Sequence, residues 1–348
     1  MEINTKQIFV SFIMLTLLLA ATFCIYTFSS SFPNALLQAQ KQQLLNQSNL
    51  TRTSEEVLES VLAKASMRNK TVIITIINKA YVEEDDGGGR AMLDMFLSSF
   101  WLGEGTRSLI DNLVIVTVDK TAYDRCNFLR LNCFRLETNG VDFEGEKLYM
   151  TQDFINMMWA RTLFLLDILK LGYNFVFTDT DVMWLRNPFT RLSKNETLDL
   201  QISADVYLGN PWSEKHKLNT GFYFVRSNNK TISLFETWYG NKDNATGLKE
   251  QDVLQDLIDD GIIGKLGMKV MFLDTLYFSG FCQDSEDFRV VTTVHANCCR
   301  SITAKVLDLK AVLHDWKKFN KLDKNSVGNL TWTKHVACVD SWTKNYNI

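Results

Sequence analysis

The chain has 348 residues, with 37 Lys and Arg against 40 Asp and Glu, so its formal net charge is −3. No run of five basic residues occurs, and a chain without basic clusters is a poor candidate for binding a phosphate backbone. We therefore expect no nucleic-acid partner. With 3 Pro, 17 Gly and 46% hydrophobic residues, the composition excludes a fibrous or disordered chain and can fill a sizeable core.

A long uncharged segment lies near the N-terminus. Residues 8–28 contain no charged side chain, and a helix of that length spans about 30 Å, the thickness of a hydrocarbon core. A cleaved signal peptide is the alternative, but its apolar segment usually has only about 7–15 residues and ends at small residues. Bulky Phe23 and Tyr26 stand here instead. We therefore predict a cytoplasmic tail (1–7) and an uncleaved membrane anchor (8–28).

The segment after the anchor indicates the compartment. Residues 29–70 are rich in Ser, Gln and Asn and are predicted to form a stem, with a short helix where Thr53 and Glu56 have capping-box spacing. N-x-[ST] sequons favour a lumenal, glycosylation-permissive location and a type II orientation. The seven candidate acceptors are Asn46, Asn49, Asn69, Asn195, Asn229, Asn244 and Asn329.

Six of the seven cysteines also follow the anchor. No C-x-x-C occurs, so a structural zinc site is not expected. An even number of cysteines in an oxidising lumen suits disulfides, although buried free thiols are an alternative. Cys126 and Cys133 are predicted to form a disulfide, because both follow the second strand in what reads as an exposed surface connection.

From Thr71 onward, strand and helix patterns alternate. Near-continuous β-branched runs are typical of strands buried on both faces. Strands are expected at 71–78, 113–119, 175–177, 199–205, 221–227, 270–274 and 289–297, and helices at 91–102, 153–171, 231–239 and 251–259. This alternation predicts an α/β fold with a mostly parallel sheet, whose ligands bind at the carboxyl ends of strands. No G-x-G-x-x-G or P-loop motif is present, so a dinucleotide site has no support.

The most informative motif is Asp179-Thr180-Asp181, the only D-x-D in the chain. It directly follows the apolar strand 175–177. Two carboxylates at a strand end can hold Mg²⁺ or Mn²⁺ and leave coordination positions for phosphate oxygens. A solvated turn or helix cap is the usual explanation of an isolated D-x-D. Its position between a buried strand and the sequence WLRNP favours the metal site.

The segment NFVFTDTDVMWLRNP resembles the plant nucleotide-diphospho-sugar transferases of glycosyltransferase family 77. The segments MMWARTLFLLDIL, NTGFYFVRSN, KEQDVL, FSGFCQDS and VHANCC share this resemblance. It implies a GT-A fold over residues 71–315, with 316–348 as a C-terminal extension packed on the domain. It also implies a UDP-sugar donor, a divalent metal (usually Mn²⁺), retention of anomeric configuration and a Golgi membrane location. Members of the family transfer arabinose or xylose to cell-wall polysaccharides or glycoproteins.

The resemblance assigns roles to individual residues. Metal ligands are expected at Asp179, Asp181 and His295, although a lone His on a strand is more often a core residue. Glu250, Gln251 and Asp252 match the segment beside the transferring sugar, with Glu where Asp is commoner; acids at a helix N-terminus are the alternative reading. Donor contacts are expected from Thr75, Asn78, Tyr81, Arg161, Asn219, Gly221 and Lys305. Arg300 could share the role of Lys305, and Arg161 could instead be a solvent-facing charge.

The sequence as a whole predicts a metal-dependent retaining glycosyltransferase of the pentosyltransferase kind. No carboxylate clearly fits the role of nucleophile, since Gln251 occupies the position expected for it, so we expect a front-face substitution assisted by the leaving phosphate. Two alternatives stay open. One is a catalytically inactive protein that binds nucleotide sugars or glycans, and the other is a nucleotide-sugar hydrolase.

Overall fold

The computed structural model describes residues 54–84, 91–137, 143, 145–147, 149–322 and 330–343. The chain divides into two compact units, residues 1–58 and 59–348. The predicted tail and membrane anchor lie outside the described residues, among which no helix is long and apolar enough to cross a membrane. The short helix expected in the stem spans residues 54–65, and the expected boundary at residue 70 falls inside the second unit.

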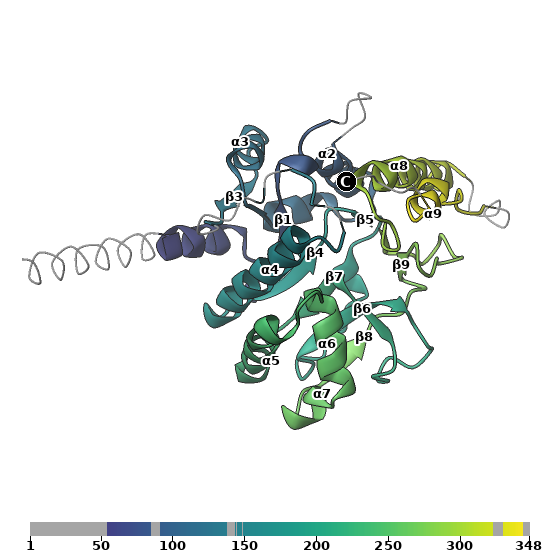
Figure 1. Ribbon diagram of the computed structural model, residues 1–348. Coiled ribbons are helices and arrows are strands. Elements are labelled where there is room, and N and C mark those ends of the chain that lie inside the picture. The colour runs from purple at the N-terminus through teal and green to yellow at the C-terminus, as the bar shows by residue number, and fades with distance from the viewer. Residues whose placement is uncertain are drawn as a thin grey trace, which may run out of the picture. The chain divides into compact units, whose positions relative to one another are not determined.

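The second unit is built on a sheet whose seven described strands have the order β3-β2-β1-β4-β7-β6-β8 (Figure 1). Strand β7 is antiparallel to its neighbours β4 and β6, whereas all other neighbouring strands are parallel. The mostly parallel sheet predicted from the sequence is therefore confirmed. The strands are β1 (Thr71–Ile77), β2 (Leu113–Thr117), β3 (Asn132–Arg135), β4 (Asn174–Thr178), β6 (Leu200–Val206), β7 (Lys217–Val225) and β8 (Val270–Phe272).

Helices cover both faces of this sheet (Figure 1). One face packs Ile73, Ile115 and Val176 against α2, α3 and α8. On the other face, Phe175 of β4 contacts Phe235 of α5 with ring centroids 6.3 Å apart. The helices are α2 (Met92–Leu102), α3 (Lys120–Phe128), α4 (Gln152–Lys170), α5 (Asn229–Gly240), α6 (Glu250–Asp259), α7 (Ile262–Lys265), α8 (Ile302–Phe319) and α9 (Val336–Asp340), with short 3-10 turns η1 (Lys79–Tyr81), η2 (Arg107–Asn112), η3 (Pro188–Thr190) and η4 (Lys242–Asn244).

Helix α4 shows how local sequence sets an element's limits. The Thr151 hydroxyl accepts a hydrogen bond from the Phe154 N–H at 3.3 Å and caps the first turn. At the other end, Gly172 has φ +79°, a left-handed conformation that glycine adopts without steric cost. The sequence-based expectation that Gly172 ends this helix is confirmed. The helix thereby places Arg161 opposite the end of β4.

A second, smaller sheet forms where the chain leaves β4. Strand β5 (Val182–Trp184) pairs antiparallel with β10 (Thr293–His295), which pairs parallel with β9 (Phe278–Gly280). The expected core strand 289–297 is therefore wrong in length and in place. Asp287 is the physical reason, because its carboxylate and carbonyl accept the N–H groups of the next residues and bend the chain into a turn.

All six cysteines after the anchor are paired. Cys126 and Cys133, the pair expected from the sequence, form a disulfide, and the other two bonds join Cys282 to Cys298 and Cys299 to Cys338. The expectation that Cys126 and Cys133 lie in an exposed surface connection is wrong. Cys126 is fully buried in α3, and Cys133 lies in β3. Neither element was predicted.

The C-terminal segment packs on the domain through α8 and α9. The expected domain limit between 315 and 316 falls inside α8, whose Trp316 is fully buried and donates its indole N–H to the Leu102 carbonyl at 3.1 Å. In the next helix, the Cys338 N–H donates to the Asp308 carboxylate at 2.8 Å. The described residues 316–322 and 330–343 are therefore part of the folded unit.

Candidate metal and donor site

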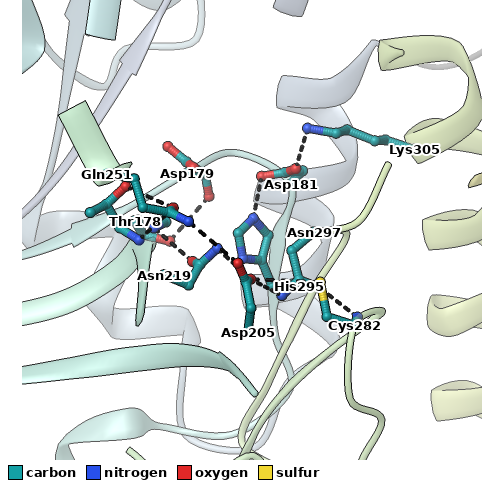
Figure 2. Close-up of polar contacts among 12 residues, drawn as sticks. Thr178, Asp179, Asp181, Asp205, Asn219, Gln251, Cys282, His295, Asn297 and Lys305 are labelled. Carbon is teal, nitrogen blue, oxygen red and sulfur yellow. Dashed lines mark hydrogen bonds and ion pairs between the residues drawn. The ribbon is translucent and has the colours of Figure 1, made fainter. Parts of the chain in front are cut away.

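The D-x-D motif and His295 meet where the two sheets diverge. Asp179 directly follows β4, and Asp181 directly precedes β5. His295 is the last residue of β10 and lies opposite Val182 in the antiparallel register, so strand pairing brings its ring to Asp181. The Nε2 atom of His295 is 3.3 Å from an Asp181 carboxylate oxygen (Figure 2). One ligand atom from each of Asp179, Asp181 and His295 can lie within 4.8 Å of the others.

Lys305 reaches the same group from the first turn of α8. Its ammonium is 2.8 Å from the other Asp181 oxygen (Figure 2). Burial alone would raise the pKa of Asp181, but Lys305 and His295 outweigh it and hold that pKa far below its usual range. Burial would likewise lower the pKa of His295, yet the Asp181 carboxylate raises it above its ordinary value. Asp181 is therefore ionised, and two basic groups converge on it.

Gly221 in β7 has no room for a side chain. A Cβ atom there would overlap the His295 ring and would lie 2.9 Å from a carboxylate oxygen of Asp179. The Gly221 carbonyl also accepts the Asp179 N–H at 2.7 Å. The expected position of Gly221 beside the donor site is thus a close-packing requirement that only glycine meets.

Arg161 is buried and pairs with two acids. Its guanidinium donates to Asp179 at 2.9 Å and to Glu250, and it lies 4.7 Å from the ring centroid of Phe177. A solvent-facing charge, the alternative considered for this residue, is thereby excluded. Glu250 also accepts the Thr220 hydroxyl at 2.8 Å. Glu250 is therefore part of a buried network in which Arg161 contacts both acids and orients Asp179.

A carboxylate that sequence analysis did not single out stands at the centre of the site. Asp205, near the end of β6, accepts hydrogen bonds from the side-chain amides of Asn219 at 2.9 Å and Asn297 at 2.7 Å (Figure 2). The Gln251 amide donates to its second oxygen at 3.3 Å. Sequence analysis assigned no carboxylate to the role of nucleophile, and Asp205 is a carboxylate beside Gln251 that it did not consider. Among the described residues, three neutral amides and no cation contact this acid.

The amide oxygens of these three residues are fixed as well. Asn219 accepts the Gly221 N–H at 2.8 Å, Gln251 accepts the Thr220 N–H at 3.1 Å, and Asn297 accepts the Cys282 N–H at 3.0 Å. Because a backbone N–H donates to each amide oxygen, each NH₂ group points toward the Asp205 carboxylate. The site therefore presents a preorganised set of donors around one acceptor.

The expected nucleoside contacts divide into two groups. Tyr81 lines the cleft, and burial raises its pKa to about 12 although Lys305 opposes the shift. Asn78 also lines it, but its amide holds the carbonyls of Phe143 and Gly145, both at 2.7 Å. Thr75 is fully buried inside β1 and does not line the cleft, so its expected donor contact is wrong. Thr75 lies two residues before the end of β1, within the sheet, and therefore does not reach the edge where the cleft lies.

The cleft that contains these groups has a volume of about 230 Å³. Segments far apart in the sequence line it, among them Phe154 and Met158 of α4 and, near the C-terminus, Arg300 and Trp342. Gln251 and Glu250 reach it from the first turn of α6, whereas Asp252 does not line it. Asp252 therefore fits the alternative reading, an acid at a helix N-terminus.

The expected glycosylation sites are partly visible. The four acceptor asparagines in described parts of the chain are all exposed, namely Asn69, Asn195, Asn229 and Asn244. The other three, Asn46, Asn49 and Asn329, lie outside the described residues. Exposure is what a glycan acceptor requires, and it leaves these four available as sites.

Comparisons with known proteins identify a family and several relatives. A family model described as nucleotide-diphospho-sugar transferase matches residues 108–309. A protein of Arabidopsis thaliana named as uncharacterized is 54% identical over 320 residues, covering 91% of this chain and 94% of that protein. The beta-arabinofuranosyltransferase RAY1 of the same plant is 30% identical over 241 residues, 64% of this chain and 41% of that protein.

Among solved structures, apo mouse xyloside xylosyltransferase 1 covers 67% of this chain and 99% of its own, with 13% identity and a TM-score of 0.42. The family model itself spans more than half of the present chain, including the D-x-D, Asp205, Gln251, His295 and Lys305. The chain belongs to the nucleotide-diphospho-sugar transferase family.

Proposed function

We propose that the chain is a retaining glycosyltransferase that moves a pentose, arabinose or xylose, from a UDP-sugar to a cell-wall polysaccharide or glycoprotein. The observation that carries this proposal is the convergence of Asp179, Asp181 and His295 in a cleft that Lys305 also enters. Carboxylates that can bind a divalent cation lie there beside the basic side chain of Lys305, as a diphosphate leaving group requires.

The donor set fits a divalent metal. Two carboxylates and one imidazole suit Mn²⁺ or Mg²⁺, with Mn²⁺ the better partner of the nitrogen ligand. When bound, such an ion neutralises charge on the diphosphate. The protein's own contributions are the buried Arg161, which fixes Asp179, and the strand pairing that aims His295 at Asp181. Lys305 supplies a further positive charge toward the leaving phosphate.

The sugar pocket is the region around Asp205. Its carboxylate can accept a hydroxyl hydrogen of the donor sugar, while the amides of Asn219, Gln251 and Asn297 donate to others. We retain front-face substitution as the mechanism. The bond between the anomeric carbon and the phosphate oxygen breaks, the acceptor oxygen bonds from the same face, and its proton passes to the departing phosphate. Both oxygens of Asp205 already accept amide hydrogens, which weakens it as a nucleophile.

The pentose assignment rests on the names of relatives. RAY1 is named as a beta-arabinofuranosyltransferase, and Arabidopsis thaliana MGP4, 24% identical over 151 residues, as a xylosyltransferase that uses UDP-D-xylose. These names support a UDP-pentose as the first donor to examine. A glycosyl adduct on Asp205 detected by mass spectrometry would replace front-face substitution with double displacement.

A donor panel tests the proposed activity. The full chain is incubated with Mn²⁺ and UDP-arabinofuranose, UDP-xylose, UDP-galactose or UDP-glucose, and UDP release is measured with and without cell-wall oligosaccharides. Release that depends on the acceptor and is greatest with a pentose supports the proposal. Release without acceptor identifies a hydrolase, and binding without release identifies an inactive module. Asp259→Asn, an exposed acid at the end of α6, is the matched control for acid substitutions in the site.

We also propose that the protein is a single-pass type II protein of the Golgi membrane with its catalytic unit in the lumen. The uncharged segment 8–28, the sequons and the three disulfides support this location. Replacing residues 1–29 by a cleavable signal peptide should yield a soluble, secreted glycoprotein. A product that stays in membranes after carbonate washing would refute the single anchor.

A further inference from the structure

The loop of residues 296–301 connects two groups that face Asp181. His295 precedes it, and Lys305 follows it within the first turn of α8. The loop itself forms part of the cleft wall through Asn297, Cys298 and Arg300. Its position therefore decides whether the imidazole and the ammonium reach the same carboxylate.

Two disulfides leave this loop in different directions. Cys298 is bonded to Cys282, just after β9, and the adjacent Cys299 is bonded to Cys338 in α9. Cys298 has φ +54°, a left-handed conformation that is unfavourable for a residue with a side chain. The loop does not adopt this shape by its own preference, so its surroundings must hold it there.

The C-terminal segment 330–343 supplies non-covalent contacts to the same loop. The Trp342 indole N–H donates to the Cys298 carbonyl at 2.8 Å, and the Arg300 N–H donates to the Ser341 hydroxyl at 3.1 Å. The Arg300 guanidinium lies 5.3 Å from the Trp342 ring centroid. Helix α9 is held in turn by the buried Asp308 of α8, which accepts the Cys338 N–H.

The same segment reaches the cleft directly. Trp342 lines it, with its ring centroid 6.2 Å from that of Tyr149, which also lines the cleft. Tyr149 in turn lies under the Lys249 ammonium, 5.2 Å from its ring centroid. The last described residues of the chain therefore form part of the wall of the site, far in sequence from the D-x-D.

We propose that residues 330–343 are a positioning element of the donor site, a C-terminal clamp that acts through the Cys299–Cys338 bond and Trp342. The clamp holds the 296–301 loop so that His295 and Lys305 meet Asp181 before the donor arrives. It rests on the proposed function in that the ligand to be held is a metal-bound UDP-sugar. A loop that is already fixed in its binding conformation loses little conformational entropy when the ligand binds. The ligand therefore binds more tightly than it would to a mobile loop.

Paired disulfide variants test the clamp. In the full chain, Cys299→Ala/Cys338→Ala removes the covalent tie, and Cys126→Ala/Cys133→Ala removes a disulfide that joins α3 to β3, away from the cleft. Calorimetry measures UDP affinity at saturating Mn²⁺, and hydrogen exchange follows peptides over 296–305. We expect the clamp variant to bind UDP about tenfold more weakly and to exchange faster in those peptides, with less than about twofold change in the control.

A milder variant covers the case in which the disulfide variant does not fold. Trp342→Phe keeps an aromatic side chain, although a smaller one, and removes the N–H that donates to Cys298, so we expect UDP to bind about threefold to fivefold more weakly. Unchanged affinity and unchanged exchange over 296–305 in a folded variant would overturn the clamp. An equal effect of the control pair would do the same, because it would show a general loss of stability.

The two proposals fail in different ways. If the wild-type chain binds no UDP in the presence of Mn²⁺, the proposed function fails. Hydrogen exchange over residues 296–305 then remains as the test of the clamp. Faster exchange over 296–305 only in the clamp variants still supports the positioning role. Normal UDP binding with uniform exchange in every variant refutes the clamp and leaves the function standing.

Discussion

The two walls of the cleft are built in different ways. The first wall carries Arg161 in the middle of α4, Asp179 directly after β4, and Tyr81 in the turn η1 that follows β1. Its strands pair in parallel over several residues, and their side chains are almost all buried. The second wall, residues 280–305, has strands of three residues and is held by disulfides, caps and the C-terminal segment.

This difference predicts different responses to mutation. In the first wall, backbone hydrogen bonds and a continuous core fix the chain, so a changed side chain alters chemistry more than geometry. In the second wall, geometry depends on a few contacts that are distant in sequence, so single changes there should displace His295 and Lys305. Asp181 lies at the join of the two walls, and it offers the most direct test.

Asp181→Asn should have the largest effect. It removes a metal-ligating charge and leaves Lys305 and His295 without their common partner, so we expect metal-dependent transfer to fall by more than about 10²-fold. Asp181 is also buried and ion-paired with Lys305. A thermal melt should therefore show some loss of stability, smaller for Asn than for Ala. Full activity in the Asn variant would remove Asp181 from the metal site.

Gly221→Ala tests how closely the walls approach. The added methyl group would displace the His295 ring from the second wall and press on Asp179 in the first. We expect Mn²⁺ affinity to fall by about 10- to 100-fold, as for other losses of ligand orientation. Gly240→Ala is the control, because a Cβ atom at that helix end would have no neighbour within 4 Å in the described part of the chain. Equal Mn²⁺ affinity in both variants would show that the two walls separate easily.

The pH dependence of metal binding reports on the contact between His295 and Asp181. The raised pKa of His295 means that the protonated ring stabilises the metal-free fold fully below about pH 6.5 and less as pH rises through the folded pKa. Mn²⁺ needs the neutral ring, so its affinity should fall by about tenfold for each pH unit below that pKa. Titrations between about pH 6 and 8 measure both trends. His295→Gln should flatten them, and a flat wild-type profile would contradict the assignment.

The sequence predicted the first wall better than the second, for physical reasons. Apolar runs and Gly172 located β1, β4 and α4, and the D-x-D needed only its position after a strand. Asp205 looks like any acid at a strand end. Its orientation depends on irregular pairing of β6 with β7, where the register shifts on both sides of Ser203 and Ala204. No pattern along the chain reveals such a shift.

The partners of the second wall are equally invisible to a local pattern. Adjacent Cys298 and Cys299 bond to residues 16 and 39 positions away, and neither distance follows from spacing. The resemblance located His295 and Lys305, but the C-terminal segment that contacts their loop was expected only to pack on the domain. Long-range packing selects those contacts, and it becomes known only when the fold is known.

Thr75→Val should have the smallest effect, and it separates the resemblance from the structure. The resemblance places Thr75 at the nucleoside, whereas the structure buries it in β1, where its hydroxyl has no hydrogen-bond partner among the described residues. Valine has nearly the same shape and removes that unpaired group, so we expect stability to stay the same or rise by about 1 kcal/mol. UDP affinity should be unchanged, because the side chain does not line the cleft. A tenfold loss of UDP affinity in a normally stable Val variant would contradict this expectation. It would mean that Thr75 contacts the nucleoside, as the resemblance implies.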